Sequence, residues 1–262
     1  MIRSLNTAAS GMNSQQLNID VIANNLANVN TPGFKKSRAE FQDLFYQQLR
    51  PTTETDEQAG QGSPAPLEVG QGVRAIATQK MFGQGTLVQT NNELDIAIEG
   101  DGFFQVQMPD GNLAYTRNGT FKLDATGQLV TSEGQVLDPP VLIPEDARGV
   151  VVSPDGTVSI IPGNSDAQVE VGQIELTRFI NPAGLQSMGH NLFAWTEGAG
   201  DPIPGQPGSD GFGQLAQGLL EGSNVQVVEE MIDLIASQRA YEINSRVIQA
   251  ADQMLRETTS MR

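Results

Sequence analysis

Glycine and proline are distributed unevenly along the chain, and this distribution constrains the fold more than any other feature of the sequence. Of the 28 glycines, 26 fall within residues 58–223, and so do 12 of the 14 prolines. The last 39 residues contain neither. Both residues disfavour helix interiors and favour turns, so we expect helical ends around a turn-rich β centre.

Both ends show the spacing of long amphipathic helices. Over residues 4–30, two series recur every seven positions, namely Leu5, Met12, Ile19 and Leu26 beside Ala8, Gln15, Ile22 and Val29. Over residues 224–258, a Ser-x-x-Gln capping box at Ser223 is followed by apolar stripes of Val228, Met231 and Ile235, then Ile243, Val247, Ala250, Ala251 and Met254. At about 1.5 Å per residue, these helices would be roughly 40 and 50 Å long.

Two long helices at opposite ends of one chain are expected to meet as a pair. Their apolar faces are narrow and contain alanine and glutamine, so burial stabilises them less than it does a leucine-rich zipper. Two interpretations remain open: a helical hairpin packed on its own domain, or a seam formed with other molecules. In the second, the helices stay disordered until a partner covers them.

The first helix is expected to end at Thr31-Pro32-Gly33-Phe34. Pro32 disfavours the helical conformation at Thr31, and the four residues fit a type II turn in which Gly33 takes a positive φ. The amides just before this turn, Asn24, Asn25 and Asn28, lie beside the apolar stripe. There they offer uncharged donors and acceptors to neighbouring subunits.

The centre, residues 71–223, is predicted to consist of short strands joined by hairpin turns. Glu93–Glu99 alternates polar and apolar residues, as in a half-buried strand, and Asp155-Gly156 separates two further apolar strands. Residues 198–213 are expected to form a long exposed loop. Residues 46–70 have the composition of a linker or an extended arm.

The net charge of −16 lies almost entirely in the centre, because residues 51–223 carry 22 Asp/Glu against six Lys/Arg. An acidic surface opposes binding to nucleic acid and to anionic membranes. The nearly neutral ends are free to pack against copies of themselves. Cysteine is absent, so disulfides and thiolate sites are excluded. No apolar run is long enough to span a bilayer, and no cleavable signal peptide is evident.

No catalytic, metal or cofactor-binding residues are expected. His190 is the only histidine and is predicted to lie in a surface loop. Gly184–Gly189 misses the spacing of a nucleophile elbow by one residue. The carboxylates Glu93, Asp95, Glu99 and Asp101 are expected on the solvent face of a strand, without the pattern of a calcium loop or a glycosidase pair.

Motifs at both ends of the chain resemble the bacterial flagellar basal-body rod and hook protein family. The N-terminal motif is Ala23–Lys35, and the C-terminal motifs are Ser223–Val225, Glu229–Met231, Gln238–Glu242 and Ala251–Leu255. The resemblance continues in the centre through Gly102–Val106 and Tyr115–Phe121. The length of the chain and its insert after Phe45-Tyr46 most resemble the distal-rod members of that family.

The resemblance implies a non-enzymatic subunit of the distal rod, which self-assembles helically into a hollow drive shaft that transmits motor torque to the hook. Its implied place is the periplasmic part of the basal body, reached through the flagellar type III export apparatus without a cleaved signal peptide. The implied partners are other copies, other rod proteins, the hook protein and the surrounding P- and L-ring proteins, with no nucleic acid and no insertion into the membrane. The alternatives are a proximal-rod or short hook-type subunit and, from another class, a secreted cell-wall enzyme.

The expected fold class is α+β, with terminal helices pairing as a coiled-coil-like stem and a mostly β central domain. The expected divisions are residues 1–33 and 224–262 for the stem, 34–70 for a linker or extended arm, and 71–223 for the β domain. The residues expected at the interface between copies are Leu5, Met12, Ile19, Ile22, Asn24, Asn25, Leu26, Asn28, Val29, Val228, Met231, Ile235, Gln238, Arg239, Tyr241, Ile243, Val247 and Met254, together with the turn Thr31, Pro32, Gly33 and Phe34.

Overall fold

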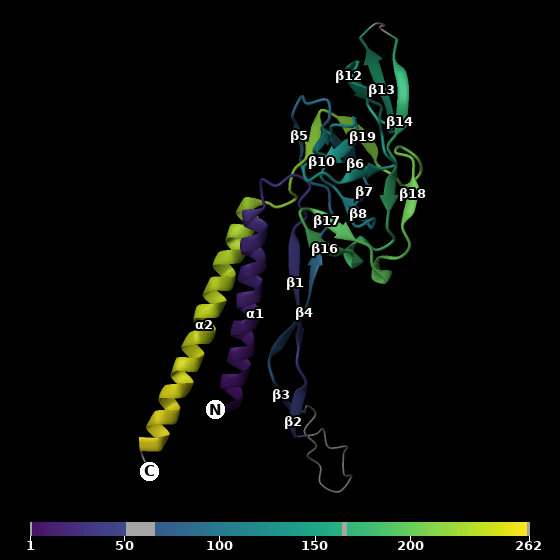
Figure 1. Cartoon of the computed structure of the whole chain (residues 1–262). Coiled ribbons are helices and arrows are strands. Elements are labelled where there is room, and N and C mark those ends of the chain that lie inside the picture. Colours follow the sequence, from purple (N-terminus) through teal and green to yellow (C-terminus); the bar gives the residue numbers. More distant parts are fainter. Residues whose placement is uncertain (1, 51–65, 164–166, 261–262) are drawn as a thin grey trace. The chain divides into compact units, whose positions relative to one another are not determined.

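The computed structural model describes residues 2–50, 66–163 and 167–260. It has a helix at each end and a mostly β centre, which confirms the predicted α+β class (Figure 1). The portion of the predicted linker or arm that covers residues 51–65 lies outside the described residues, as do the extreme ends of the predicted stem.

The terminal helices are α1 (Ile2–Ala27) and α2 (Val227–Ser260). Helix α2 begins three residues later than expected, because the Ser223 side chain does not act as its N-cap. The Ser223 hydroxyl instead accepts a hydrogen bond from the Val225 N–H at 3.3 Å, in a local turn that precedes the helix. The predicted capping box is therefore wrong. Glu229 and Glu230 lie in the first turn, where carboxylates favour the helix dipole.

The strands are short and follow one another closely through the centre. They are β1 (Ser37–Asp43), β2 (Tyr46–Arg50), β3 (Leu67–Gly70), β4 (Val73–Lys80), β5 (Leu87–Gln89), β6 (Ile96–Glu99), β7 (Phe103–Gln107), β8 (Leu113–Thr116), β9 (Phe121–Leu123), β10 (Leu129–Thr131), β11 (Val136–Asp138), β12 (Ala147–Val152), β13 (Thr157–Pro162), β14 (Val169–Gln173), β15 (Leu176–Arg178), β16 (Gln186–Gly189), β17 (Leu192–Ala194), β18 (Ile203–Gly205), β19 (Gln214–Gln217) and β20 (Leu219–Glu221). Two single-turn 3₁₀ helices, η1 (Pro182–Gly184) and η2 (Glu197–Ala199), lie among them.

The chain divides into two compact units, each made of segments that are distant in sequence. The helical unit comprises residues 1–26, 37–79 and 227–262, and the β unit comprises residues 27–36 and 80–226. In the helical unit, β1 pairs with β4 and β2 with β3. These strands form a two-stranded ribbon, called the arm below and defined as residues 37–50 and 66–79. The described part of the segment expected as a linker or arm is thus largely β.

The β unit is built around one large antiparallel sheet. Its strand order is β16-β17-β8-β7-β11-β10-β9, with β15 pairing to both β7 and β18. A three-stranded sheet, β12-β13-β14, and the pairs β19-β6 and β20-β5 complete it. The main core includes Phe104, Val106, Leu137, Ile174 and Leu176, all with fully buried side chains. A second cluster packs Phe103, Tyr115, Phe179 and Phe193 with edge-to-face rings.

Two predictions about the centre are wrong. Glu93–Glu99 does not form a half-buried strand, because Ile96, Ala97 and Ile98 are all at most 1% exposed and both faces of β6 lie inside the core. Asp95 is likewise buried, and its carboxylate accepts a hydrogen bond from Asn92 Nδ2 at 3.1 Å. Residues 198–213 are not simply an exposed loop, because they contain β18 and the fully buried Ala199.

Candidate subunit interface

Helices α1 and α2 contact each other in an antiparallel register with a seven-residue repeat (Figure 1). Asn25 Nδ2 donates to Glu230 Oε2 at 3.1 Å, and Asn18 Nδ2 donates to Ser237 Oγ at 2.9 Å. Next along, the α-carbon of Gly11 lies so close to α2 that an added Cβ would be 3.1 Å from the side-chain nitrogen of Asn244. Successive contacts are seven residues apart on both helices, so a single register accounts for all three.

The side of each helix that faces the other is mostly polar or small, with the buried Ile22 of α1 as a large apolar exception. Asn25, Glu230 and Ser237 are at most 5% exposed, and Ser14 is also buried. Apart from Ile22, the buried apolar residues in the described part of the two helices are Ala8 and Ala251, which have little surface to remove from water. Contact between the two helices therefore gains little hydrophobic stabilisation.

The large apolar residues of α2 remain exposed instead. We call the set Val228, Met231, Ile232, Ile235, Ile243, Val247 and Met254 the α2 stripe, and its members are between 43 and 70% exposed. At about 100° of rotation per residue, Val228, Ile232 and Ile235 lie on the side of α2 that faces away from Glu230 and Ser237. Further along, Ile243, Val247 and Met254 lie on a flank, about 60–100° around the helix from Asn244. Most large apolar residues of α2 are thus exposed, while polar residues of both helices are buried.

The predicted interface residues fall into three groups by burial. All those on α2 are exposed, namely Val228, Met231, Ile235, Gln238, Arg239, Tyr241, Ile243, Val247 and Met254. Those in the N-terminal segment are mostly half-buried, namely Leu5, Met12, Ile19, Leu26, Asn28 and Val29, with Asn24 exposed. Ile22 and Asn25 are buried inside the subunit.

Asn25 differs from the expectation that its amide would face a neighbouring subunit. Its Oδ1 accepts from the Ser37 N–H at 2.9 Å, and its Nδ2 donates to the Ser37 carbonyl at 2.8 Å as well as to Glu230. The side chain thereby pairs with the backbone of β1 much as a second strand would, while also holding α2. This amide serves the fold of its own subunit.

The predicted turn is confirmed. Gly33 has φ of +70°, and the Phe34 N–H donates to the Thr31 carbonyl at 3.3 Å, as a type II turn requires. A Cβ at Gly33 would lie 2.7 Å from the backbone nitrogen of Asn118, so the turn also packs too tightly for a side chain. Asn191 Nδ2 donates to the Pro32 carbonyl at 3.0 Å.

A buried ionic cluster in the β unit fixes the segment that follows this turn. Glu221 Oε1 accepts from Lys35 Nζ at 2.6 Å and from the Gly85 N–H at 2.9 Å, and Glu221 Oε2 lies 3.3 Å from Arg117 Nη1. The Glu221 carbonyl accepts from the Gly33 N–H at 2.7 Å. All three charged side chains are at most 3% exposed. One carboxylate thus joins the turn, the strand that ends at Glu221 and the segment that carries Arg117.

Burial governs the protonation behaviour of both cations in this cluster. It lowers the pKa of Lys35, and the neighbouring Glu221 opposes that shift. Burial likewise lowers the pKa of Arg117 against the attraction of Glu221 and Asp101. The guanidinium carbon of Arg117 lies 5.3 Å from the ring centre of Phe103, and its Nε has no hydrogen-bond partner among the described residues.

Asn224 adds a second set of buried contacts beside the cluster. Its Oδ1 accepts from the Lys36 N–H at 2.7 Å, and its Nδ2 donates to the Met81 and Gly83 carbonyls at 2.7 and 3.1 Å. The family motifs in the sequence contain Lys35, Arg117 and Asn224, but sequence reasoning assigned them no structural role. The motifs that contain them are rich in polar residues, so apolar periodicity did not distinguish these three.

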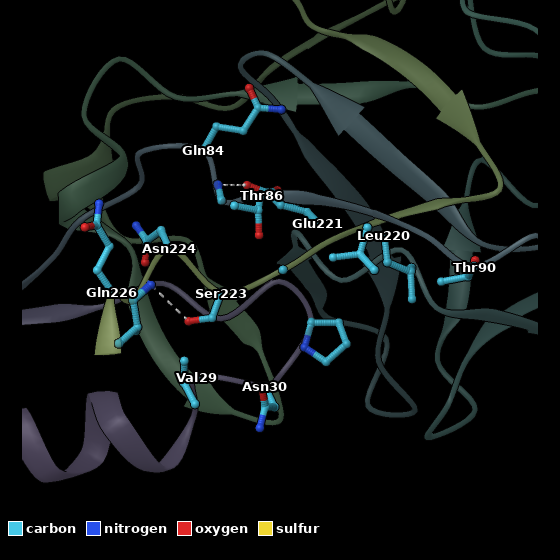
Figure 2. Close-up of a pocket in the computed structure, with 15 residues that line it drawn as sticks. Val29, Asn30, Gln84, Thr86, Thr90, Leu220, Glu221, Ser223, Asn224 and Gln226 are labelled. Atoms are coloured by element: carbon cyan, nitrogen blue, oxygen red, sulfur yellow. Dashed lines mark hydrogen bonds between the residues drawn. The ribbon is translucent and has the colours of Figure 1, made fainter. Parts of the chain in front are cut away.

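A cavity of about 510 Å³ lies next to this cluster, between the turn after α1 and the strand pair β5-β20 (Figure 2). Its walls are amides, hydroxyls and small apolar groups, including Asn30, Thr86, Val88 and Gln226. Glu221 is the one ionisable side chain among the residues that line it, and that carboxylate is already engaged. The cavity therefore holds no acid–base pair for catalysis.

The remaining residues considered for chemistry have ordinary surroundings. His190 lies on an exposed turn and contacts Glu133. Within residues 2–50, 66–163 and 167–260, no cluster of three or more His, Asp or Glu has the geometry to hold a metal ion. In that same part of the chain, no helix is long and apolar enough to span a membrane.

Comparison with known proteins places these features in one family. Residues 5–35 match the family described as flagella basal body rod protein, residues 97–160 match the D1 domain of flagellar hook protein FlgE/F/G, and residues 216–261 match the C-terminal region of flagellar basal body rod FlgEFG proteins. The chain is 52% identical to the flagellar basal-body rod protein FlgG of Borreliella burgdorferi over 97% of both chains. It is 38% identical to FlgG of Bacillus subtilis over the full length of both.

Among solved structures, the flagellar hook protein FlgE2 of Helicobacter pylori matches with a TM-score of 0.24 and 14% identity, covering 71% of this chain and 56% of that chain. A likeness this weak supports no argument about the fold. The sequence relationships are strong and extend from one end of the chain to the other. The chain therefore belongs to the family of flagellar basal-body rod proteins named FlgG.

Proposed function

We propose that this protein is a structural subunit of the distal rod, which assembles helically with its own copies through the paired terminal helices. The observation that carries this proposal is the exposed α2 stripe on a helix pair whose own contact is made largely by polar and small residues. A protein that functioned alone would be expected to bury such a stripe in its own core.

The energetics favour assembly as the step that covers these residues. Burying one large aliphatic side chain contributes about 1.5–3 kcal/mol, and the α2 stripe offers seven such side chains, half of whose surface is typically exposed. Within the subunit, two hydrogen bonds join α1 to α2, from Asn18 to Ser237 and from Asn25 to Glu230. They align the two helices but contribute little to their stability. The helix pair then acts as a coiled-coil-like stem whose apolar contacts lie between copies.

The family also suggests where the subunit works and what it meets. We place the rod in the periplasmic part of the basal body, where it carries torque from the motor to the hook. Its neighbours there would be other rod proteins, the hook protein and the P- and L-ring proteins, and it would reach them through the flagellar export apparatus. The acidic β unit would form the solvated outer layer, because like charges resist close packing.

Electron microscopy of basal bodies from a deletion strain tests the function. We expect rods that end short of the hook, and their restoration when the wild-type chain is supplied from a plasmid. Complete rods that carry hooks in the deletion strain would refute the assignment. Complete rods without hooks would contradict it as well, because they would place the missing subunit beyond the rod.

A further inference from the structure

The arm carries a second set of exposed apolar side chains, distributed over both faces of its ribbon, because Tyr46 pairs with Gly70 whereas Val69 pairs with Gln47. Its members are Phe41, Phe45, Tyr46, Leu49, Leu67, Val69 and Ile76, which are between 38 and 88% exposed, with Phe45 the most exposed of all. We call this set the arm patch. A two-stranded ribbon is marginally stable in water, and a patch of this kind usually marks an interaction site.

The arm is held by α1, and among the arm patch Val69 lines the cavity between them, while the other members keep much of their surface exposed. Ser10 Oγ accepts from the Val73 N–H at 3.3 Å, and Asn25 pairs with the backbone of Ser37. Arg3, Asn6 and Thr7 of α1 line a small cavity with residues of β2 and β3. The contact with α1 does not extend along the whole arm, since residues 74–78 of β4 are all exposed.

The arm and α2 occupy different faces of α1, so neither covers the apolar surface of the other. Gly11 and Asn18 face α2, whereas Ser10, about 100° around the helix from Gly11, faces the arm. Figure 1 shows α1 between α2 and the arm. The members of the α2 stripe are 43–70% exposed, so α1 leaves much of their surface uncovered. Each subunit thus presents two uncovered apolar surfaces on different flanks of its helical unit.

We propose that the arm patch of one copy docks on the α2 stripe of a second copy. This deepens the proposed function, on which it rests, by naming the two surfaces that meet. Because the surfaces differ, the contact is heterologous, and repeating it generates a ring or an open helix rather than a closed dimer. Contact between two identical stripes would instead end in a pair.

The distribution of charge also favours the arm patch, rather than the β unit, as the surface that covers the α2 stripe. The arm is balanced in charge, with three Arg and three Asp/Glu, whereas residues 227–260 carry six Asp/Glu against three Arg. Residues 80–226 carry 18 Asp/Glu against five Lys/Arg. A surface of that kind would repel the carboxylates beside the α2 stripe.

Photo-crosslinking in assembled rods tests the contact whatever its register. Phe45 is replaced by p-benzoylphenylalanine, which keeps an aromatic side chain at the most exposed position of the arm patch. Rods are assembled from a mixture of ¹⁴N- and ¹⁵N-labelled subunits, irradiated, digested and analysed by mass spectrometry, so that crosslinks between copies are distinguished from those within one copy. The same probe at Val169, an exposed strand residue of the β unit, is the matched control.

We expect mixed-isotope crosslinks from position 45 to peptides within residues 227–257, and none of these from position 169. Crosslinks from position 45 to another arm, to the β unit or only within one copy would overturn the proposal while leaving rod assembly intact. If the Phe45 variant does not assemble, the probe is placed at Ile76 and the same outcomes apply. Failure of the unmodified chain to form rods would count against the proposed function and not against this contact alone.

Discussion

At the scale of residues, the N-terminal motif serves the subunit's own fold more than its surface. Gly33 and Lys35 are both buried, and both are tied to Glu221. Asn25 is tied to β1 and to α2. Sequence patterns predicted the turn correctly, because proline and glycine restrict the backbone locally. They did not predict the partners of Lys35 or Asn25, because those partners lie 186 and 205 positions away in the sequence.

Glu221→Gln is expected to destabilise the β unit by about 3–5 kcal/mol, because it leaves two buried cations without their carboxylate. Urea unfolding followed by the fluorescence of Trp195, the one tryptophan in the chain, reports on this unit directly. Glu99→Gln, at an exposed carboxylate of β6, serves as the control and should cost little. A loss below about 1 kcal/mol for Glu221→Gln would show that the cluster is not a stabilising element.

Asn25→Ala is expected to reduce rod assembly far more than Asn24→Ala, because Asn25 is buried and Asn24 is exposed. The substitution removes the amide that pairs with the N–H and carbonyl of Ser37, at about 1–3 kcal/mol for each group left unsatisfied, and it also removes one hydrogen bond to Glu230. Swimming motility and rod yield measure the effect, and the fluorescence of Trp195 checks that the β unit still folds. Equal behaviour of the two variants would contradict the role given to Asn25.

At the scale of elements, the helices were predictable and their mutual orientation was not. The absence of glycine and proline from the C-terminal segment and the seven-residue repeat located both helices to within a few residues. The side of α2 that faces α1 was not predicted, because the prediction relied on the spacing of apolar residues, whereas the contact is made largely by polar ones. A signal was present, since Gly11, Asn18 and Asn25 recur every seven residues, as do Glu230, Ser237 and Asn244.

Ile235→Asp and Leu26→Asp are each expected to abolish rod assembly while leaving the β unit folded. A carboxylate at either position would have to be buried between copies without a partner, which is strongly unfavourable. Val169→Asp is the matched control, because Val169 is 49% exposed and Ile235 is 47% exposed. Rod yield and the fluorescence of Trp195 are measured together. Normal rods from either helix variant would refute its place at the interface.

At the scale of the whole molecule, the division into helical ends and an acidic β centre followed from composition, because glycine, proline and charge are all distributed unevenly. Membership of a structural family of rod proteins agrees with the prediction that the chain is not an enzyme. Two details of the β unit were beyond pattern analysis. The burial of both faces of β6 and of Asp95 depends on strands distant in sequence, which no local alternation reveals.

The two units are expected to differ in stability before assembly. The helical unit exposes the α2 stripe and the arm patch, whereas the β unit has a continuous buried core. Limited proteolysis of the isolated subunit should therefore trim both ends of the chain and leave a fragment close to residues 80–226. Mass spectrometry identifies the fragment. Ends as resistant as the centre would show that the helix pair is stable without partners.

The apolar residues left exposed on α2 are expected to be covered by other copies in the rod. Electron cryo-microscopy of rods assembled from this chain is the decisive measurement, because a helical reconstruction shows the surroundings of each side chain. We expect Ile232, Ile235 and Ile243 to lie buried between subunits, with α1 and α2 forming the inner tube. Rods in which these three side chains face solvent, or in which the β units alone hold the copies together, would contradict this expectation.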